Sequence, residues 1–144
     1  MIEYILGVKG EDVVTVAPDT SVQAAVELMR TNVIGIIVVC SYGGCIIGVL
    51  SERDCVRGIA DHVNKLEEMT VDELMTPNPI TCTPDTDPLD VMITMKNKGF
   101  RHMPVVSGDE LVGLISITDL NKIILAEADV SEDWRNRLQR AGVV

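Results

Sequence analysis

The chain contains one sequence segment written twice. Residues 14–59 align with residues 80–124 with a single one-residue gap. The clearest matches are VTVAPDT (14–20) with ITCTPDT (80–86) and GVLSERD (48–54) with GLISITD (113–119). A repeat of this length is typical of a supersecondary unit that is too small to bury its apolar face alone. In a chain of 144 residues, the duplication predicts two small halves that share a core rather than two independent domains.

Both copies predict the same order of elements. A short β-type stretch leads through Pro-Asp-Thr into a helix, which starts at Ser21 in the first copy and at Asp87, before Pro88, in the second. Two apolar runs follow in the first copy, 34–40 and 45–50, and the Gly-containing turn between them predicts a hairpin, after which a second helix starts at Ser51. One face of the first helix is apolar at helical spacing: Val22, Ala25, Val26 and Met29. We therefore expect an α/β (α+β) fold with two tandem β-α-β-β-α repeats, packed about a pseudo-twofold axis.

Proline and capping signals predict where the copies end. The segment 70–75 has a capping-box start and ends before Pro77 and Pro79, so it is expected to form a short linker helix. The segment 131–138 runs from acidic to basic residues after Ser131, which indicates another helix with Trp134 and Leu138 on one face. The expected boundaries are 8–64 for the first repeat, 65–78 for the linker helix, 79–127 for the second repeat and 128–144 for the C-terminal helix.

Charge and hydropathy exclude several classes of partner. A formal net charge of −10 repels a phosphate backbone and no run of Lys or Arg offsets it, so we expect no nucleic-acid binding. The apolar runs 33–40 and 45–50 are much shorter than the roughly 20 residues of a membrane helix. Residues 1–4 have neither the basic start and cleavage site of a secretory signal nor the Arg-rich character of a transit peptide. A cytoplasmic protein without a membrane span is expected.

The reactive residue types form no catalytic or metal pattern. The four cysteines, Cys40, Cys45, Cys55 and Cys82, have no CxxC spacing and no companion His cluster, so no metal is expected. They are interpreted as reduced buried thiols, the alternative being a redox-sensing disulfide between Cys40 and Cys45 across the hairpin. The sequence has no Ser-His-Asp or Cys-His constellation and no Walker or Rossmann glycine pattern, so no enzymatic activity is expected.

The segments GVLSERD (48–54) and GLISITD (113–119) and the strand Arg101–Val105, which contains Pro104, carry a family resemblance. They resemble the marks of the cystathionine-β-synthase (CBS) domain pair, also called a Bateman module, and the similarity runs from about Val8 to Glu127, as in small stand-alone CBS-domain proteins. The resemblance implies a regulatory module that binds AMP, ATP, NAD(H) or another adenosine ligand in the cleft between the repeats. It also implies a flat head-to-head homodimer and a protein partner that reads the conformational change.

The resemblance further implies two nucleotide clefts, each combining the closing segment of one copy with strands of the other. In family members the closing Asp holds the ribose hydroxyls, and the resemblance implies the same role here. A carboxylate suits that role because it can accept two charge-assisted hydrogen bonds from vicinal hydroxyls. The principal cleft is expected to combine Ser51, Arg53, Asp54, Ile80, Arg101, His102, Met103 and Pro104. The second cleft is expected to combine Val14, Gly35, Ile36, Ser116, Thr118 and Asp119; it has no evident cation, so it is expected to be weaker or vacant.

Each of these residues also has a purely structural interpretation. Ser followed three residues later by an acid is a helix capping box, Arg101 and His102 suit ordinary ion pairs at a strand end, and Gly35 suits tight strand packing. The corresponding alternative function is a ligand-free scaffold for dimerisation or protein interaction.

Overall fold

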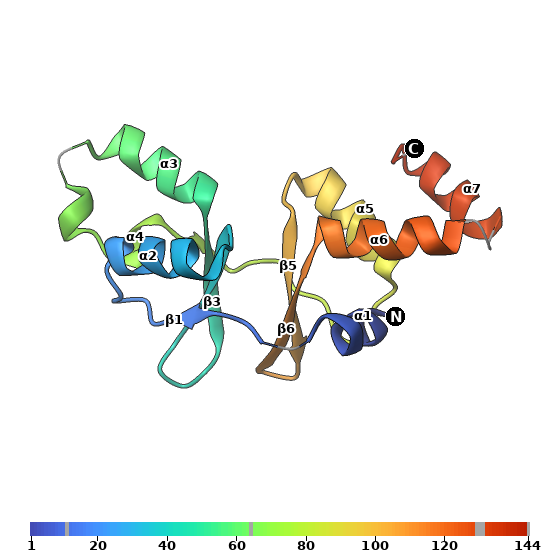
Figure 1. Ribbon diagram of the computed structural model, residues 1–144, viewed down its shortest axis with the longest axis horizontal. Helices are drawn as coiled ribbons and strands as arrows, with labels where there is room; N and C mark the ends of the chain where they lie inside the picture. Colours follow the sequence, from blue (N-terminus) through green and yellow to red (C-terminus); the bar gives the residue numbers. More distant parts are fainter. Residues whose placement is uncertain (11, 64, 129–131, 144) are drawn as a thin grey trace. The chain divides into compact units, whose positions relative to one another are not determined.

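The computed structural model describes residues 1–10, 12–63, 65–128 and 132–143, which fold into two compact units. Unit 2 comprises Val13–Pro79 with Gly108–Leu111, and therefore contains the first copy of the repeat. Unit 1 comprises Met1–Asp12, Ile80–Ser107 and Val112–Val144. The N-terminal residues thus belong with the second copy, and the segment expected to be a linker belongs with the first (Figure 1).

Unit 2 is built on a four-stranded sheet with the order β1-β2-β3-β4. The strands are β1 (Thr15–Val16), β2 (Ile36–Cys40), β3 (Ile46–Ser51) and β4 (Thr76–Pro77). β1 is parallel to β2, whereas β3 is antiparallel to both β2 and β4. The sequence predicts three of these strands; it misses β4, because two residues that contain a proline carry no strand signal of their own and pair only where the chain passes beside Gly48 and Val49.

The α-helices of unit 2 begin where the local sequence predicts, whereas the 3₁₀ turn that precedes the last of them was not predicted. They are α2 (Val22–Asn32), α3 (Glu52–Asp61), the 3₁₀ turn η1 (Leu66–Glu68) and α4 (Val71–Leu74). The Ser21 hydroxyl accepts a hydrogen bond from the Ala24 N–H at 3.1 Å, and the Glu73 carboxylate accepts one from the Thr70 N–H at 2.8 Å. These bonds satisfy N–H groups at the helix start, which have no acceptor within the helix itself.

The core of unit 2 lies between the sheet and its helices. Figure 1 shows α2 and α3 on the same side of the β2–β3 hairpin. Val26 was expected on the buried face of α2 but is 42% exposed, because it faces the space between α2 and α3 instead. Buried apolar residues that pack into one cluster in this core are Val16, Ala25, Met29, Ile37, Val39, Leu50 and Val71.

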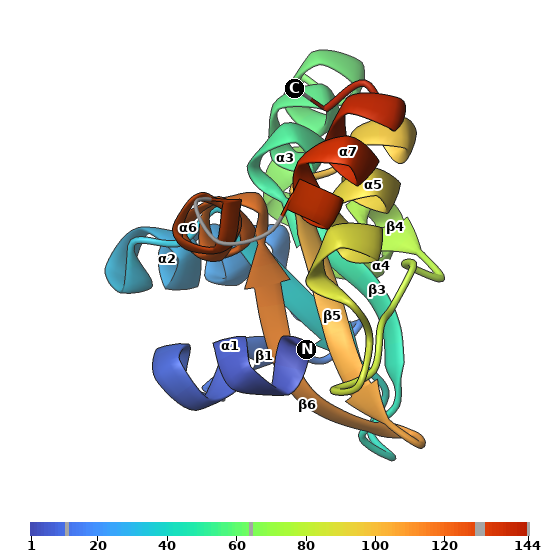
Figure 2. The ribbon, with the colours of Figure 1, turned by 90° about the vertical axis from the view of Figure 1, so that its right-hand side faces the viewer.

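Unit 1 repeats this plan with fewer strand pairs. Its elements are α1 (Ile2–Lys9), α5 (Pro88–Lys98), β5 (His102–Ser107), β6 (Glu110–Ser116, which belongs to this unit from Val112 on), α6 (Ile117–Ala128) and α7 (Glu132–Arg140). β5 and β6 form a two-stranded sheet, and a parallel bridge from Cys82 to Val105 stands where β1 lies in the other unit. Figures 1 and 2 show α5 and α6 on the same face of this hairpin.

Helix α1 is an integral part of unit 1. Its first N–H groups donate to the turn of the second copy, from Ile2 to the Thr86 carbonyl at 3.1 Å and from Glu3 to the Pro84 carbonyl at 2.8 Å. Ile2, Ile5 and Leu6 are each at most 3% exposed and belong to the core of this unit. Helix α1 therefore completes a core that the second copy alone would leave open.

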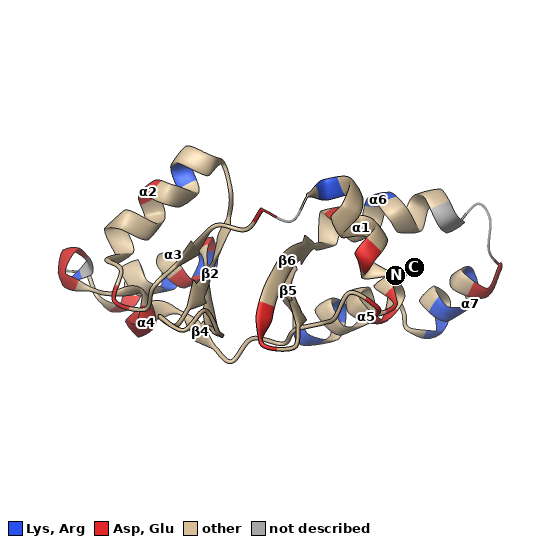
Figure 3. Cartoon of the chain, turned by 90° about the horizontal axis from the view of Figure 1, so that it is seen from below, with Lys and Arg blue, Asp and Glu red and all other residues tan. Residues whose placement is uncertain are grey.

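Helix α7 packs on α5 in the same unit. Leu138 is buried, and the Arg137 guanidinium donates to Asp87 at 2.9 Å and to Asp90 at 3.1 Å. Figure 3 shows the acidic start and basic end of α7, the arrangement that opposes its helix dipole. The predicted cap at Ser131 lies outside the described residues.

Candidate functional site

Asp54 is held by a capping box at the start of α3. Its Oδ2 accepts hydrogen bonds from the Ser51 N–H at 2.9 Å and the Ser51 hydroxyl at 3.0 Å, while its own N–H donates to Ser51 Oγ at 3.2 Å. The other carboxylate oxygen, Oδ1, accepts a longer bond from the Thr76 hydroxyl at 3.3 Å. The cap therefore occupies one oxygen of Asp54 and leaves the second in a weaker contact.

Asp119 repeats this geometry in unit 1. Its Oδ2 accepts from the Ser116 N–H at 2.9 Å and the Ser116 hydroxyl at 2.8 Å, and its N–H donates to Ser116 Oγ at 3.1 Å. Both Ser-x-x-Asp segments are thus real capping boxes, as the structural interpretation predicts. Capping does not exhaust a carboxylate, which has about four acceptor positions on its two oxygens.

Asp119 has a partner that Asp54 does not share. The Lys9 ammonium at the end of α1 donates to Asp119 Oδ2 at 2.6 Å and to the Leu114 carbonyl at 2.8 Å. Burial raises the pKa of the Asp119 carboxyl, but hydrogen bonds from Lys9 and Ser116 outweigh this effect, so the net pKa lies below its ordinary value. The sequence predicts no cation in the second cleft, but Asp119, one of its residues, is paired with Lys9.

Lys9 was missed because nothing in its sequence surroundings points to Asp119. The two residues are 110 positions apart, and Lys9 precedes the duplicated segment altogether. The only local signal is a basic residue in the last turn of α1, which is explained equally well by the helix dipole.

In each unit, the first strand of the hairpin begins next to the capped Ser-x-x-Asp segment of the same unit. In unit 2 the Glu52 N–H donates to the Gly35 carbonyl at 2.9 Å, and Ile36 pairs with Ser51. In unit 1 the equivalent bond runs from the Ile117 N–H to the Arg101 carbonyl at 2.8 Å. In each unit, the start of the first hairpin strand therefore lies beside the segment that carries the fixed carboxylate.

The other predicted site residues differ in exposure. Arg53, Thr118 and Arg101 are exposed, and Ile80 is 42% exposed. Buried or half-buried members are Val14, Ile36, His102, Met103 and Pro104. Both expected sets draw on both units, so the structure describes each set as two separate halves.

Glycines in these segments allow close packing. A Cβ at Gly48 would overlap the Met75 sulfur and lie 3.0 Å from the Thr76 carbonyl oxygen. A Cβ at Gly113 would overlap a methyl group of Leu6 on α1. At Gly35 a Cβ would lie 3.1 Å from the Glu52 carboxyl carbon, which is the end of a flexible side chain on α3 and not a neighbouring strand.

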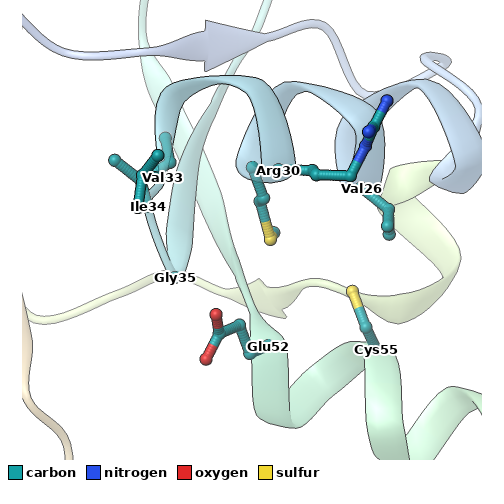
Figure 4. A pocket seen from close by; sticks show the side chains of 8 residues that line it. Val26, Arg30, Val33, Ile34, Gly35, Glu52 and Cys55 are labelled. Carbon is teal, nitrogen blue, oxygen red and sulfur yellow. The ribbon is translucent and has the colours of Figure 1, made fainter.

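A cavity of about 580 Å³ lies between α2 and α3 of unit 2. Figure 4 shows Cys55 pointing from α3 toward α2, and the Glu52 carboxylate pointing toward Gly35. Burial, and then the nearby carboxylates of Asp54 and Glu52, raise the pKa of the Cys55 thiol. The thiol is therefore neutral near pH 7 and suits an apolar wall rather than a nucleophile.

Within 1–10, 12–63, 65–128 and 132–143, no group of three or more His, Cys, Asp or Glu side chains is arranged to hold a metal ion. Over the same ranges, no helix has the length and hydropathy needed to cross a bilayer.

Comparisons with known proteins agree on one family. The family model of the CBS domain matches residues 8–61 and 71–126. A crystal structure of a CBS-domain containing protein from Agrobacterium tumefaciens is 35% identical, with a TM-score of 0.80 over 84% of this chain and 90% of that chain. The crystal structure of CBSX2 in complex with AMP is 26% identical, with a TM-score of 0.68 over 82% of this chain and 90% of that chain.

Among curated proteins, an uncharacterized protein of Methanocaldococcus jannaschii is 30% identical over 142 residues. The alignment covers 98% of this chain but 48% of that relative, so the chain spans about half of its length.

Proposed function

This chain belongs to the CBS domain family, with two CBS repeats in tandem, and on that premise we propose that it is a regulatory module that binds an adenosine-containing ligand. The observation that carries the proposal is the matched pair of fixed carboxylates, Asp54 and Asp119, each held by a serine at a strand-to-helix junction. A carboxylate fixed in this way can accept hydrogen bonds from ribose hydroxyls without first losing side-chain freedom.

AMP is the ligand that we propose first. Support comes from the AMP complex of CBSX2, which is 26% identical to this chain. ATP and NAD(H) share the adenosine part and remain the alternatives. The base would be recognised by backbone groups at the start of the first hairpin strand. Gly35 and Arg101 stand at these positions, and their carbonyls accept hydrogen bonds from the N–H groups of Glu52 and Ile117.

The set that contains Asp54 is proposed as the principal site. It combines Asp54 with Arg53 and Arg101, which supply positive charge for a phosphate in a chain of net charge −10, and with His102, which supplies a polar contact. The set that contains Asp119 is proposed as the weaker site.

We further propose that ligand binding is read through helices α2 and α3. Val26, Val56 and Ile59 are 42%, 65% and 54% exposed on these two helices, an arrangement suited to a homodimer or to a regulated partner protein. The ligand would act by favouring one relative orientation of the repeats, and thereby one state of this surface. A cytoplasmic energy-sensing role and the lack of catalysis stay predictions.

Calorimetric titration with AMP tests the proposal. Asp54→Asn keeps an acceptor for the cap but removes the charge, and is expected to weaken binding roughly tenfold or more. Asp61→Ala, which removes an exposed carboxylate from the other end of α3, is the matched control and should bind as the parent does.

The competing function is a ligand-free scaffold, in which the capping boxes only cap. It gains support if AMP, ATP and NAD(H) at high concentration all leave the melting temperature of the parent protein unchanged, since a ligand that binds the folded state must raise it.

A further inference from the structure

The ion pair between Lys9 and Asp119 makes the two repeats chemically unequal. Lys9 Nζ lies 2.6 Å from Asp119 Oδ2, and its side chain is 37% exposed while that of Asp119 is 17% exposed. The ammonium is also anchored by the Leu114 carbonyl at 2.8 Å. Two of its three N–H donors are therefore used inside unit 1.

Asp54 provides an internal comparison, which shows that Lys9 is not needed to orient the carboxylate. Its orientation is set by the Ser51 N–H and hydroxyl, as that of Asp119 is set by Ser116. Its further contact is the neutral Thr76 hydroxyl at 3.3 Å. Because Ser51 and one long, neutral contact are enough to orient the carboxylate in unit 2, the contact from Lys9 in unit 1 mainly adds charge compensation.

Charge compensation lowers the ability of Asp119 to bind a sugar. Its Oδ2 already receives three donors, from the Ser116 N–H, the Ser116 hydroxyl and Lys9. That exceeds the roughly two acceptor positions of one carboxylate oxygen. At Oδ2 a ribose diol would have to displace the ammonium. At Oδ1 it would donate weaker hydrogen bonds, because the charge of the carboxylate is partly neutralised by Lys9.

We propose that Lys9 is an intramolecular competitor for the Asp119 carboxylate, which lowers the affinity of the second-repeat half-site for ribose and makes the two nucleotide sites unequal. The inference rests on the proposed function, and adds to it a specificity-determining residue outside the duplicated segment. The module would then respond to its ligand at two separate concentrations, because the Asp54 site fills first.

Titration of the second site by itself tests this inference. In an Asp54→Asn background, Lys9→Met removes the ammonium but keeps most of the aliphatic chain, whereas Lys9→Arg keeps the charge. The Met variant is expected to bind both AMP and adenosine more tightly, by on the order of fivefold, because a partly exposed ion pair no longer has to be broken. The Arg variant should bind as the Asp54→Asn parent does.

Three results would overturn the inference. The first is that the Met variant binds both ligands with unchanged affinity. The second is that it binds both ligands more weakly. The third is weaker binding of AMP with unchanged binding of adenosine, because that pattern would make Lys9 a phosphate partner instead.

Two controls separate this inference from folding effects and from the proposed function. Lys9→Gln, which can still donate to the Leu114 carbonyl, should change affinity in the same direction as Lys9→Met. Lys9→Met alone should leave the tighter site, assigned to Asp54, at its parental affinity, which shows that the fold is retained. If the unsubstituted chain binds neither AMP nor adenosine, the proposed function itself fails, an outcome distinct from binding that is insensitive to Lys9.

Discussion

Val33 and Gly99 end equivalent helices of the two repeats, and both have a left-handed backbone, with φ of 53° and 78°. The turn is thus the same in both copies, although only one has the residue type that reaches this conformation without strain. A β-branched residue here brings its Cβ close to a backbone carbonyl, at a cost of roughly 1–2 kcal/mol. Val33 is 90% exposed, so little burial offsets that cost.

Val33→Gly is therefore expected to stabilise the protein. Relief of the left-handed strain exceeds the roughly 0.5–1 kcal/mol of extra backbone entropy that glycine loses on folding, so the net gain is about 0.5–1 kcal/mol. Urea denaturation measures it. The reciprocal change, Gly99→Val, should destabilise by a comparable amount, and a loss of stability in both variants would contradict this account.

Stability should depend on pH through Asp119. Its folded pKa lies below the ordinary value of 3.8, so its ion pair contributes stability above that value and loses it as pH falls through the folded pKa. Asp119→Asn should lower the free energy of unfolding at pH 7 by up to about 1 kcal/mol, and by progressively less below pH 4. Urea titrations of parent and variant at several pH values measure the difference.

Lys9 provides the check on that pH dependence. In a Lys9→Met background, the pH-dependent part of the Asp119→Asn effect should shrink, because the ammonium that lowers the pKa is gone. An undiminished pH dependence would mean that Ser116 alone lowers the pKa.

Gly48→Ala is expected to destabilise unit 2. The new methyl group would overlap the Met75 sulfur and lie 3.0 Å from the Thr76 carbonyl oxygen, so β4 would have to move away from β3. Overpacking of this kind costs about 1–3 kcal/mol. Gly43→Ala is the matched control, since its nearest atom is the Ser41 hydroxyl at 3.8 Å, and thermal melts of both variants should separate clearly.

Cys82 should be the least reactive of the four thiols. Burial raises its pKa to about 11, a backbone hydrogen bond opposing the shift only in part, and its side chain is 6% exposed. At pH 8 about one molecule in a thousand carries the reactive thiolate. Alkylation followed by mass spectrometry should modify the exposed Cys45 first and Cys82 only on unfolding; equal rates would contradict the burial seen here.

The same structure bears on the two interpretations of the cysteines. Cys40, Cys45, Cys55 and Cys82 are all free thiols, but Cys45 is exposed and Cys40 half-buried, so burial protects only some of them. Hairpin position alone could not reveal this difference, because the register of β2 against β3 shifts between Val39 and Cys40.

Features that depend on neighbours a few residues apart could be predicted from the sequence. The helix starts at Ser21, Ser51 and Asp87, the glycine turns and the capped carboxylates Asp54 and Asp119 all match the structure. Each is closed by a hydrogen bond or a backbone angle within about four residues, so the local sequence contains all of its participants.

What the sequence determined by itself is the doubled unit, its CBS identity and the position of an oriented carboxylate in each copy, because duplication and capping are properties of short segments. The tertiary structure alone decided that α1 completes the unit of the second copy, that Thr76 and Pro77 extend the sheet of the first, and that Lys9 meets Asp119. These pairings join segments that are distant in the sequence. Their geometry depends on where apolar faces, such as that of Ile2, Ile5 and Leu6, are buried in a core, and no local sequence pattern encodes that.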